Sequence, residues 1–212
     1  MPIEIISENC NQKKEDTVNV FVAQPKWEES DWKEEDNLFF PANSQVQIDY
    51  INMYLEKSLE INSDIVVFPE LSILENHLVL IKEWAQINNK IVIAGSQYYI
   101  DETSTMNIAP IYINKKCIKK EKTIAASLEK SVLIERNLKV GNKFIKFENT
   151  ICGTLCVFIC AEYLDENTRH KVLEKDDIDV LIIIALQKDS SHYYKRIDLT
   201  VDESNPNNEI EK

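Results

Sequence analysis

Glycine and histidine are scarce in this sequence, and both shortages narrow the chemistry it can carry. The chain of 212 residues holds only 3 glycines, and neither GxGxxG nor GxxxxGK[ST] occurs in it. Because such loops use glycine to bring the backbone close to a phosphate, the sequence excludes sites of those two types and predicts no cofactor. The 3 histidines, His77, His170 and His192, stand in no recognisable Cys–His setting.

Positive charge and long apolar runs are scarce too. There are 24 Lys and Arg against 36 Asp and Glu, which gives a formal net charge of −12. Such a surface repels phosphate backbones, so we expect no direct nucleic-acid partner. Apolar runs such as VLIIIAL are much shorter than the ~20 residues of a membrane-spanning helix, and residues 1–17 lack the apolar core of a signal peptide. The odd number of cysteines, 5, without secretory features predicts reduced thiols, no membrane partner and a cytoplasmic protein.

The spacing of apolar residues predicts one layered α/β domain with a mixed sheet. IAPIYI and CIKKEK are expected to form a hairpin, and the acidic stretch KWEESDWKEEDN a loop. We place an N-terminal extension at residues 1–17, the domain at residues 18–200 and a polar tail at residues 201–212. The other predicted strands cover residues 18–24, 64–70, 90–99, 143–147, 150–160 and 179–186, and the predicted helices cover residues 44–61, 75–87 and 165–174.

Three of the cysteines, Cys152, Cys156 and Cys160, fall four residues apart in ICGTLCVFIC. In a strand they would share one face but spread over roughly 26 Å, at about 3.3 Å per residue, which is too far for one metal ion. Free cysteine behaves as a small hydrophobe, so we assign Cys152 and Cys156 to the core and predict no metal. Cys160 ends the apolar run where the chain turns toward a helix, a position that faces a cleft. Position alone leaves open whether Cys160 is a nucleophile or another buried thiol.

Three stretches of the chain, taken in order, resemble one known family. VVFPEL carries Glu70 at the end of a strand, KKEKTIAASLEKS carries Lys122 followed by Glu129, and GTLCVFICAE carries Cys160. With VNVFVAQ and DVLIIIAL as flanking strands, they are similar to the nitrilase, or carbon–nitrogen hydrolase, superfamily over roughly residues 18–190. The resemblance implies a nitrilase-like αββα sandwich with a mixed central sheet. It also implies a chain that lacks the usual C-terminal elements, because members of the family usually continue beyond the DVLIIIAL strand.

The resemblance also implies catalytic roles. Glu70 matches the general base, Lys122 the catalytic lysine, Cys160 the nucleophile, and Glu129 an additional glutamate that orients Lys122 or the substrate. A thiol that attacks an amide needs a base and stabilisation of the developing charge. Glu70 would take the thiol proton, and the Lys122 ammonium with the backbone N–H of Ala161 would stabilise the charge.

Several of these residues also have simpler interpretations. Glu70 could cap the helix that follows its strand, and Lys122 could belong to a solvated hairpin edge, with Lys119 and Lys120 as rivals for its role. Glu162 could support the site or be a charge at the start of a helix. His170 is expected on a helix surface.

The sequence therefore predicts a hydrolase of a small amide or other non-peptide C–N bond that works through a thioester intermediate. The expected partner is an amide or nitrile substrate, and the resemblance implies a homo-oligomer or a subunit of a larger assembly. One alternative is a catalytically degenerate nitrilase-like module for assembly. Another is a cysteine hydrolase that depends on a histidine such as His170.

Overall fold

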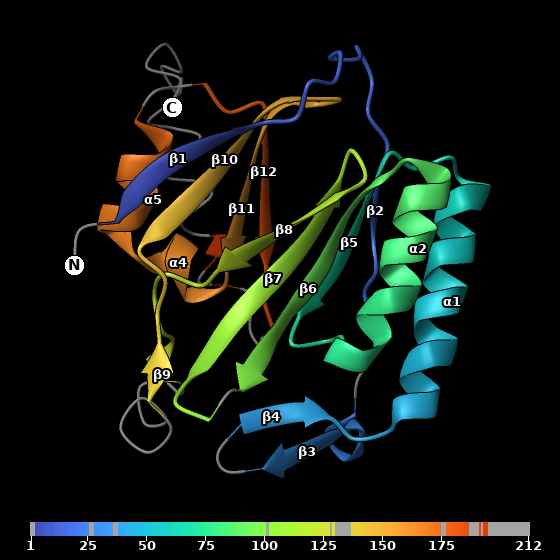
Figure 1. Ribbon diagram of the computed structural model, residues 1–212, viewed down its shortest axis with the longest axis vertical. Helices are drawn as coiled ribbons and strands as arrows, with labels where there is room; N and C mark the ends of the chain where they lie inside the picture. Colours follow the sequence, from blue (N-terminus) through green and yellow to red (C-terminus); the bar gives the residue numbers. More distant parts are fainter. Residues whose placement is uncertain are drawn as a thin grey trace, which may run out of the picture.

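The molecule is built in four layers, with two β-sheets face to face and helices on the outer side of each sheet (Figure 1). This arrangement confirms the predicted αββα sandwich. The computed structural model describes residues 3–25, 28–35, 38–100, 102–127, 129, 137–174, 177–186, 191, 193 and 194. The polar tail predicted at residues 201–212 and the histidine at position 192 lie outside the described residues.

The larger sheet has the strand order β2-β5-β6-β7-β8, and β9 pairs with β7. β2, β5 and β6 run parallel to one another. β7 and β8 are antiparallel neighbours and form the predicted hairpin. The sheet is therefore mixed, as the sequence predicts. Its strands are β2 (Val20–Val22), β5 (Ile65–Glu70), β6 (Ile91–Ile100), β7 (Thr105–Ile113), β8 (Lys116–Glu121) and β9 (Leu138–Lys139).

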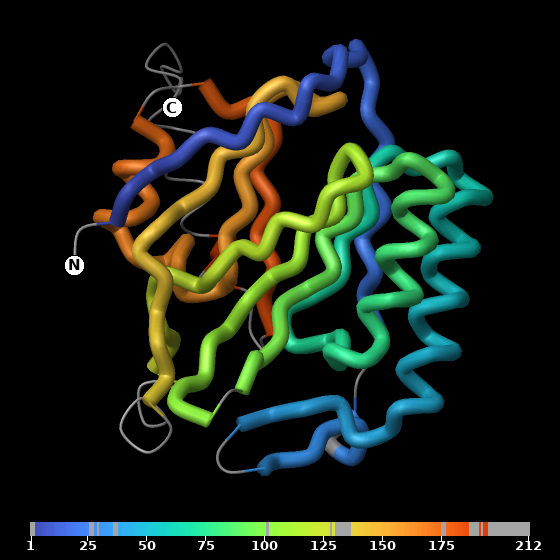
Figure 2. Tube along the Cα trace, in the orientation of Figure 1, coloured from blue at the N-terminus to red at the C-terminus, as the bar shows by residue number. Residues whose placement is uncertain are grey.

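The smaller sheet has the order β1-β10-β11-β12, formed by β1 (Glu4–Asn9), β10 (Lys143–Thr150), β11 (Gly153–Ile159) and β12 (Val180–Ile184). The sequence analysis predicted only an extension before residue 18, but β1 lies parallel to β10 along its whole length. Figure 2 shows this blue segment beside β10 at the edge of the sheet. The alternation of apolar and polar residues in β1 is weak because an edge strand buries few side chains. This explains why the sequence pattern did not predict the strand.

Alternating side chains explain the layers. In β5, Ile65 and Val67 point into the apolar cluster between the sheets, whereas Val66 and Phe68 point toward the helices. Two helices, α1 (Ser44–Glu60) and α2 (Leu78–Asn88), cover that outer face. On the other side α4 (Ala161–Leu164) and α5 (Glu166–Leu173) cover the smaller sheet. Central strands such as β5 are thus covered on both faces, which accounts for the continuous apolar run of β5.

The loop predicted at KWEESDWKEEDN is wrong in part. The 3₁₀ turn η1 (Glu29–Asp31) leads into β3 (Trp32–Glu35), which pairs antiparallel with β4 (Leu38–Pro41). The acidic side chains of β3 face solvent, so the strand shows no apolar periodicity. β4 supplies the buried contacts, since Leu38 packs in one cluster with Leu71 and Tyr98.

Small shifts separate the other predicted elements from the observed ones. A 3₁₀ turn, η2 (Glu75–His77), precedes α2. Thr150 ends β10 instead of starting β11, because its hydroxyl donates to the carbonyl of Gly153 and closes the turn between them. Helix α1 begins where predicted, after Asn43, whose side chain accepts from the amides of Gln45 and Val46. No helix in the described part of the chain has the length and apolar character that crossing a membrane requires.

Candidate active site

The side chains of Glu70, Lys122, Glu129 and Cys160 meet at one end of the sandwich. Glu70 ends β5, Lys122 directly follows β8, and Cys160 directly follows β11. The Lys122 Nζ lies 2.8 Å from Glu70 Oε1 and 2.8 Å from Glu129 Oε2. The Cys160 thiol interacts with both Glu70 and Lys122. All four residues selected from the sequence are therefore neighbours, and their chemical roles stay predictions.

Cys160 stands on a sharp turn between strand and helix. Its backbone has φ 49° and ψ −108°, a conformation that is costly for a residue with a side chain. Its amide donates to the carbonyl of Ile184 at 2.8 Å, which ties the turn to the neighbouring strand β12. Ala161 is the first residue of α4, and the amides of the first helical turn have no acceptor within the helix. This placement leaves the Ala161 N–H available for the predicted stabilising role.

The thiol of Cys160 is held in its protonated form. Burial raises its pKa to about 11, and the Glu70 carboxylate adds to the shift while Lys122 opposes it. The hydroxyl of Tyr193 donates to the sulfur at 3.2 Å and also opposes it, since a donor stabilises the thiolate. The thiol therefore needs a base before it can attack, and Glu70 is in place to act as one.

The charge of Lys122 is fixed by its two carboxylates. Burial alone would lower its pKa, but Glu70 and Glu129 raise the pKa above the ordinary value. Burial would likewise raise the pKa of Glu129, but Lys122, Asn107 and the amide of Ala126 together lower it. Lys122 is thus an ammonium and Glu129 a carboxylate, which is the state the predicted mechanism needs.

Asn107 orients both carboxylates, and the sequence analysis missed it. Its Nδ2 donates to Glu70 Oε1 at 3.3 Å and to Glu129 Oε1 at 2.9 Å. The backbone carbonyl of Asn107 accepts a hydrogen bond from the backbone amide of Lys122 at 2.8 Å. Tyr98 also donates to Glu129 Oε1, at 3.3 Å. The only available signal for Asn107 is one amide side chain at the start of the apolar run IAPIYI.

A second buried ion pair lies beside the site. Lys120 Nζ is 2.8 Å and 2.7 Å from the two carboxylate oxygens of Glu162, and both side chains are 0% exposed. Glu162 also accepts from the amide of Ile159 and from the amide and hydroxyl of Thr123. It therefore joins the turn that holds Cys160 to the segment that holds Lys122. Glu162 also lies in the first turn of α4, so both of the positions expected for it are compatible with the structure, and its supporting role stays a prediction.

The rival lysines do not occupy the place of Lys122. Lys120 contacts Glu162, and burial lowers its pKa while Glu162 opposes that shift. Lys119 lies over the ring of Tyr99, 4.5 Å from the ring centre. Lys122 is also 3% exposed, which rules out the solvated hairpin edge considered for it.

Neither of the histidines in the described part of the chain contacts Cys160. His170 lies on the surface of α5 and pairs with Glu166 at 3.6 Å, as expected for a helix surface. His77 is buried and hydrogen-bonds Gln47 and the Ser44 hydroxyl. The histidine-dependent alternative therefore finds no support among the described residues.

The other cysteines of the CxxxCxxxC stretch pack in the core, as predicted. Cys152 belongs to the cluster between the sheets, and Cys156 to the cluster under α4 and α5. The expectation that all three share one face is wrong, because Cys152 and Cys160 flank β11 and only Cys156 lies within it. In the described residues no group of three or more His, Cys, Asp or Glu could hold a metal ion.

The fold is that of the nitrilase superfamily. An amidase of that superfamily from Nesterenkonia is 10% identical with a TM-score of 0.62, and the match covers 87% of this chain and 71% of the amidase. A carbon–nitrogen hydrolase from Helicobacter pylori is 13% identical with a TM-score of 0.56, over 88% and 67% of the two chains. The glutamine-dependent NAD⁺ synthetase of Acinetobacter baumannii is 16% identical with a TM-score of 0.54, over 76% of this chain and 33% of the synthetase.

The match thus spans about a third of the synthetase and about two thirds of the hydrolase. No protein-family model matches the sequence, and comparison with curated proteins found no match. At these identities the likeness shows the fold and leaves the activity to be argued from the site.

Proposed function

We propose that this chain is a thiol-dependent hydrolase of a small amide or other non-peptide C–N bond. The observation that carries the proposal is the position of Lys122, whose ammonium lies 2.8 Å from each of two carboxylates beside a protonated thiol. The contacts match the needs of amide hydrolysis, which are a nucleophile, a base within reach of it and a fixed positive charge.

In the proposed reaction Glu70 takes the proton of Cys160 as the sulfur attacks the carbonyl carbon. The C=O electron pair moves onto oxygen, where Lys122 and the Ala161 N–H stabilise the negative charge. The oxyanion then collapses, the C–N bond breaks, and the departing nitrogen takes the proton from Glu70. This leaves a thioester. Water gives a proton to Glu70 and attacks the thioester carbon, which releases the acid and returns the proton to the sulfur. Glu129 keeps Lys122 in place throughout.

The test uses fluoroacetamide, whose acetamide moiety adds covalently to the active-site cysteine in the structure of a glutamate-to-leucine variant of an amidase with a similar fold. We expect an adduct at Cys160, mapped by mass spectrometry, that forms markedly more slowly in Glu70→Gln and Lys122→Ala than in the wild type. Cys156→Ser is the matched control, because this thiol is buried away from both partners and its loss leaves the reaction intact. Release of ammonia from a panel of small amides would then establish turnover.

One observation favours a second candidate, a catalytically degenerate module for assembly. Glu70 and Lys122 are each 3% exposed and Cys160 is 4% exposed, so the three side chains can also act as a structural network. Equal labelling of all thiols by fluoroacetamide, or no labelling of any, would favour this candidate over the hydrolase. Assembly as a homo-oligomer or in a larger complex is part of either proposal, and gel filtration with light scattering tests it.

A further inference from the structure

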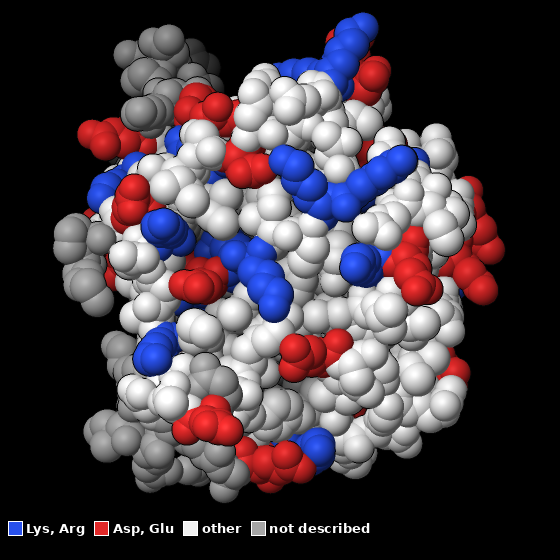
Figure 3. Space-filling model, in the orientation of Figure 1, with Lys and Arg blue, Asp and Glu red and all other residues white. Residues whose placement is uncertain are grey.

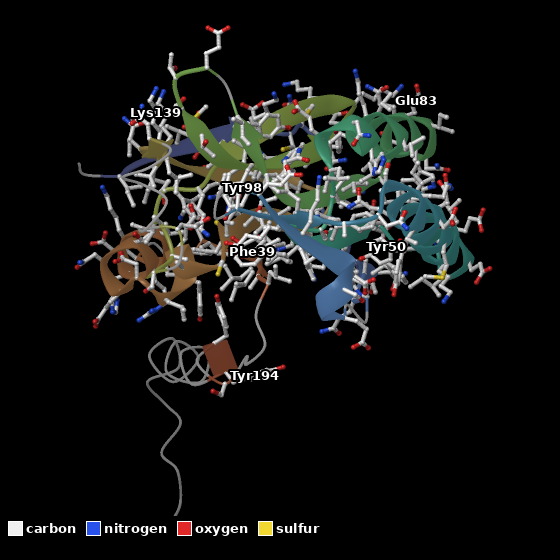
Figure 4. The ribbon with its side chains drawn as sticks, turned by 90° about the horizontal axis from the view of Figure 1, so that it is seen from below. Phe39, Tyr50, Glu83, Tyr98, Lys139 and Tyr194 are labelled. Atoms are coloured by element: carbon white, nitrogen blue, oxygen red, sulfur yellow. The ribbon has the colours of Figure 1, made fainter. Side chains whose placement is uncertain are left out.

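A pocket of about 510 Å³ lies next to the candidate active site, between the β3–β4 hairpin and the ends of β5 and β6. Phe39, Phe40 and Pro41 of β4 form one side, and Leu71 and Tyr98 form the other. In the view from below, Phe39 and Tyr98 lie near the middle of the molecule, away from Glu83 on α2 (Figure 4). Ligands in α/β proteins bind outside the carboxyl ends of strands, which is where this pocket lies.

The pocket shares walls with the triad. Leu71 directly follows Glu70 and has a left-handed backbone, φ 57°. Tyr98 lines the pocket with its ring and donates its hydroxyl to Glu129. Leu186, in the same apolar cluster as Leu71 and Tyr98, donates its amide to Glu70 at 3.2 Å. Single side chains therefore separate the pocket from the triad. A substrate whose reacting carbon lies at Cys160 can extend its acyl chain into the pocket.

Two of the polar side chains that line the pocket, Gln97 and Glu75, offer acceptors, and Asn76 adds an amide that can donate or accept. Gln97 is 6% exposed, its Nε2 donates to the Tyr99 hydroxyl at 2.9 Å, and its Oε1 has no hydrogen-bond partner among the described residues. Glu75 adds a carboxylate at the rim, and no described Lys, Arg or His lines the pocket. A buried acceptor without a partner costs free energy that a donor from a ligand would recover. The remaining lining is mainly aliphatic and aromatic.

From this chemistry we infer that the pocket binds the acyl part of the substrate, and that this part is an apolar chain ending in a protonated amine or another N–H donor. The inference rests on the proposed function and narrows its substrate class. The amine donates to Gln97 Oε1 and lies near the Glu75 carboxylate, while the methylene groups contact the ring of Phe39. A substrate that ends in a carboxylate is disfavoured, because it would place negative charge beside Glu75 and an acceptor beside Gln97.

The test compares three electrophiles of equal length: 2-chlorohexanamide, 6-amino-2-chlorohexanamide and the monoamide of 2-chloroadipic acid. In each, the Cys160 sulfur forms a C–S bond, chloride leaves, and Glu70 takes the thiol proton. The measured quantity is the second-order rate of labelling at Cys160, with the exposed Cys117 as an internal reference for unselective reaction. We expect the amine to react about tenfold faster than the neutral chain, as one hydrogen bond to a charged group implies, and the carboxylate to react slowest.

Two variants assign the preference to the pocket. Gln97→Leu is expected to remove most of the advantage of the amine, and Glu75→Gln part of it, with the advantage measured in each variant as the ratio of the amine rate to the neutral-chain rate. Glu83→Gln, which changes another exposed acid, this one on α2, is the matched control and should leave the preference intact. Hexylamine should protect Cys160 from the amine electrophile in the wild type, which provides a measurement independent of whether the variants fold.

The outcomes separate the two proposals. If no electrophile labels Cys160, the hydrolase itself fails. If Cys160 is labelled but the amine has no advantage, or the advantage survives both variants, or hexylamine gives no protection, the pocket inference is overturned and the hydrolase stands.

Discussion

Removal of the Glu162 charge should destabilise the protein through Lys120. Glu162→Gln keeps the side-chain size but leaves the Lys120 ammonium buried at 0% exposure without its carboxylate. The side-chain NH₂ of the new Gln would also face other donors, because both carboxylate oxygens of Glu162 accept hydrogen bonds from Ile159, Thr123 and Lys120. The expected loss is about 3–5 kcal/mol of unfolding free energy, the usual cost of removing one partner of a buried pair. For a chain of this size that lowers the melting temperature by roughly 6–20 °C.

The pH dependence identifies the cause. Burial lowers the pKa of Lys120 and Glu162 opposes that shift, so the variant lysine should lose its proton at still lower pH. In the unfolded chain the lysine keeps its proton up to its ordinary pKa, so the unfolded state binds more protons between the two pKa values. The variant should therefore gain stability relative to the wild type as pH rises through that window.

Urea unfolding followed by circular dichroism at several pH values measures both effects. Adding Lys120→Met to Glu162→Gln should recover part of the loss, because the methionine would pack against the ring of Phe144, now 4.6 Å from Lys120 Nζ. Glu166→Gln, an exposed acid on α5, is the control. A deficit below about 1 kcal/mol, in the range of exposed ion pairs, or one that does not change with pH, would refute the reasoning.

Three further predictions concern the residues around the triad. Tyr193→Phe removes a donor to the Cys160 sulfur, so the thiol pKa should rise further and alkylation near pH 8 should slow about tenfold, with the midpoint of its pH profile moved upward. Unchanged alkylation would contradict that contact. Asn107→Leu removes both hydrogen bonds to the glutamates and should lower the unfolding free energy by about 2–3 kcal/mol in urea titrations, and Asn107→Asp should cost more by adding a third carboxylate. His170→Ala should change stability by less than about 0.5 kcal/mol and leave labelling of Cys160 intact, since this histidine and its partner are both exposed; loss of labelling would revive the histidine-dependent alternative.

The resemblance to the nitrilase superfamily, carried by VVFPEL, KKEKTIAASLEKS and GTLCVFICAE, was sufficient to select the four residues whose side chains meet. Glu70 and Cys160 each close an apolar run, and such ends converge at one edge of a layered α/β fold. Lys122 was separable from Lys120 by its context, although both turned out to be buried. No local pattern could show that Lys120 pairs with Glu162, because the two are 42 residues apart and only the packing of the sheets joins them.

Other features depend on contacts that the sequence does not encode locally. Tyr193 reaches Cys160 from beyond the last described strand, and nothing in HYYKRID marks it as a partner of a thiol. β1 was missed because it is an edge strand with half its side chains in solvent. The acidic surface was predictable from composition, and Figure 3 shows acidic and basic side chains interspersed on one face of the molecule. The absence of a nucleic-acid partner stays a prediction.

The buried group formed by Glu70, Glu129, Lys122 and the Cys160 thiol determines how the first chemical step should depend on pH. Its ionic groups carry one net negative charge while the sulfur is neutral. Moving the proton from the Cys160 sulfur to Glu70 redistributes that charge without changing its total. Formation of the thiolate would therefore take up no proton from solvent and release none to it. The velocity of the first chemical step should then be flat across neutral pH, and its solvent isotope effect should report one internal transfer.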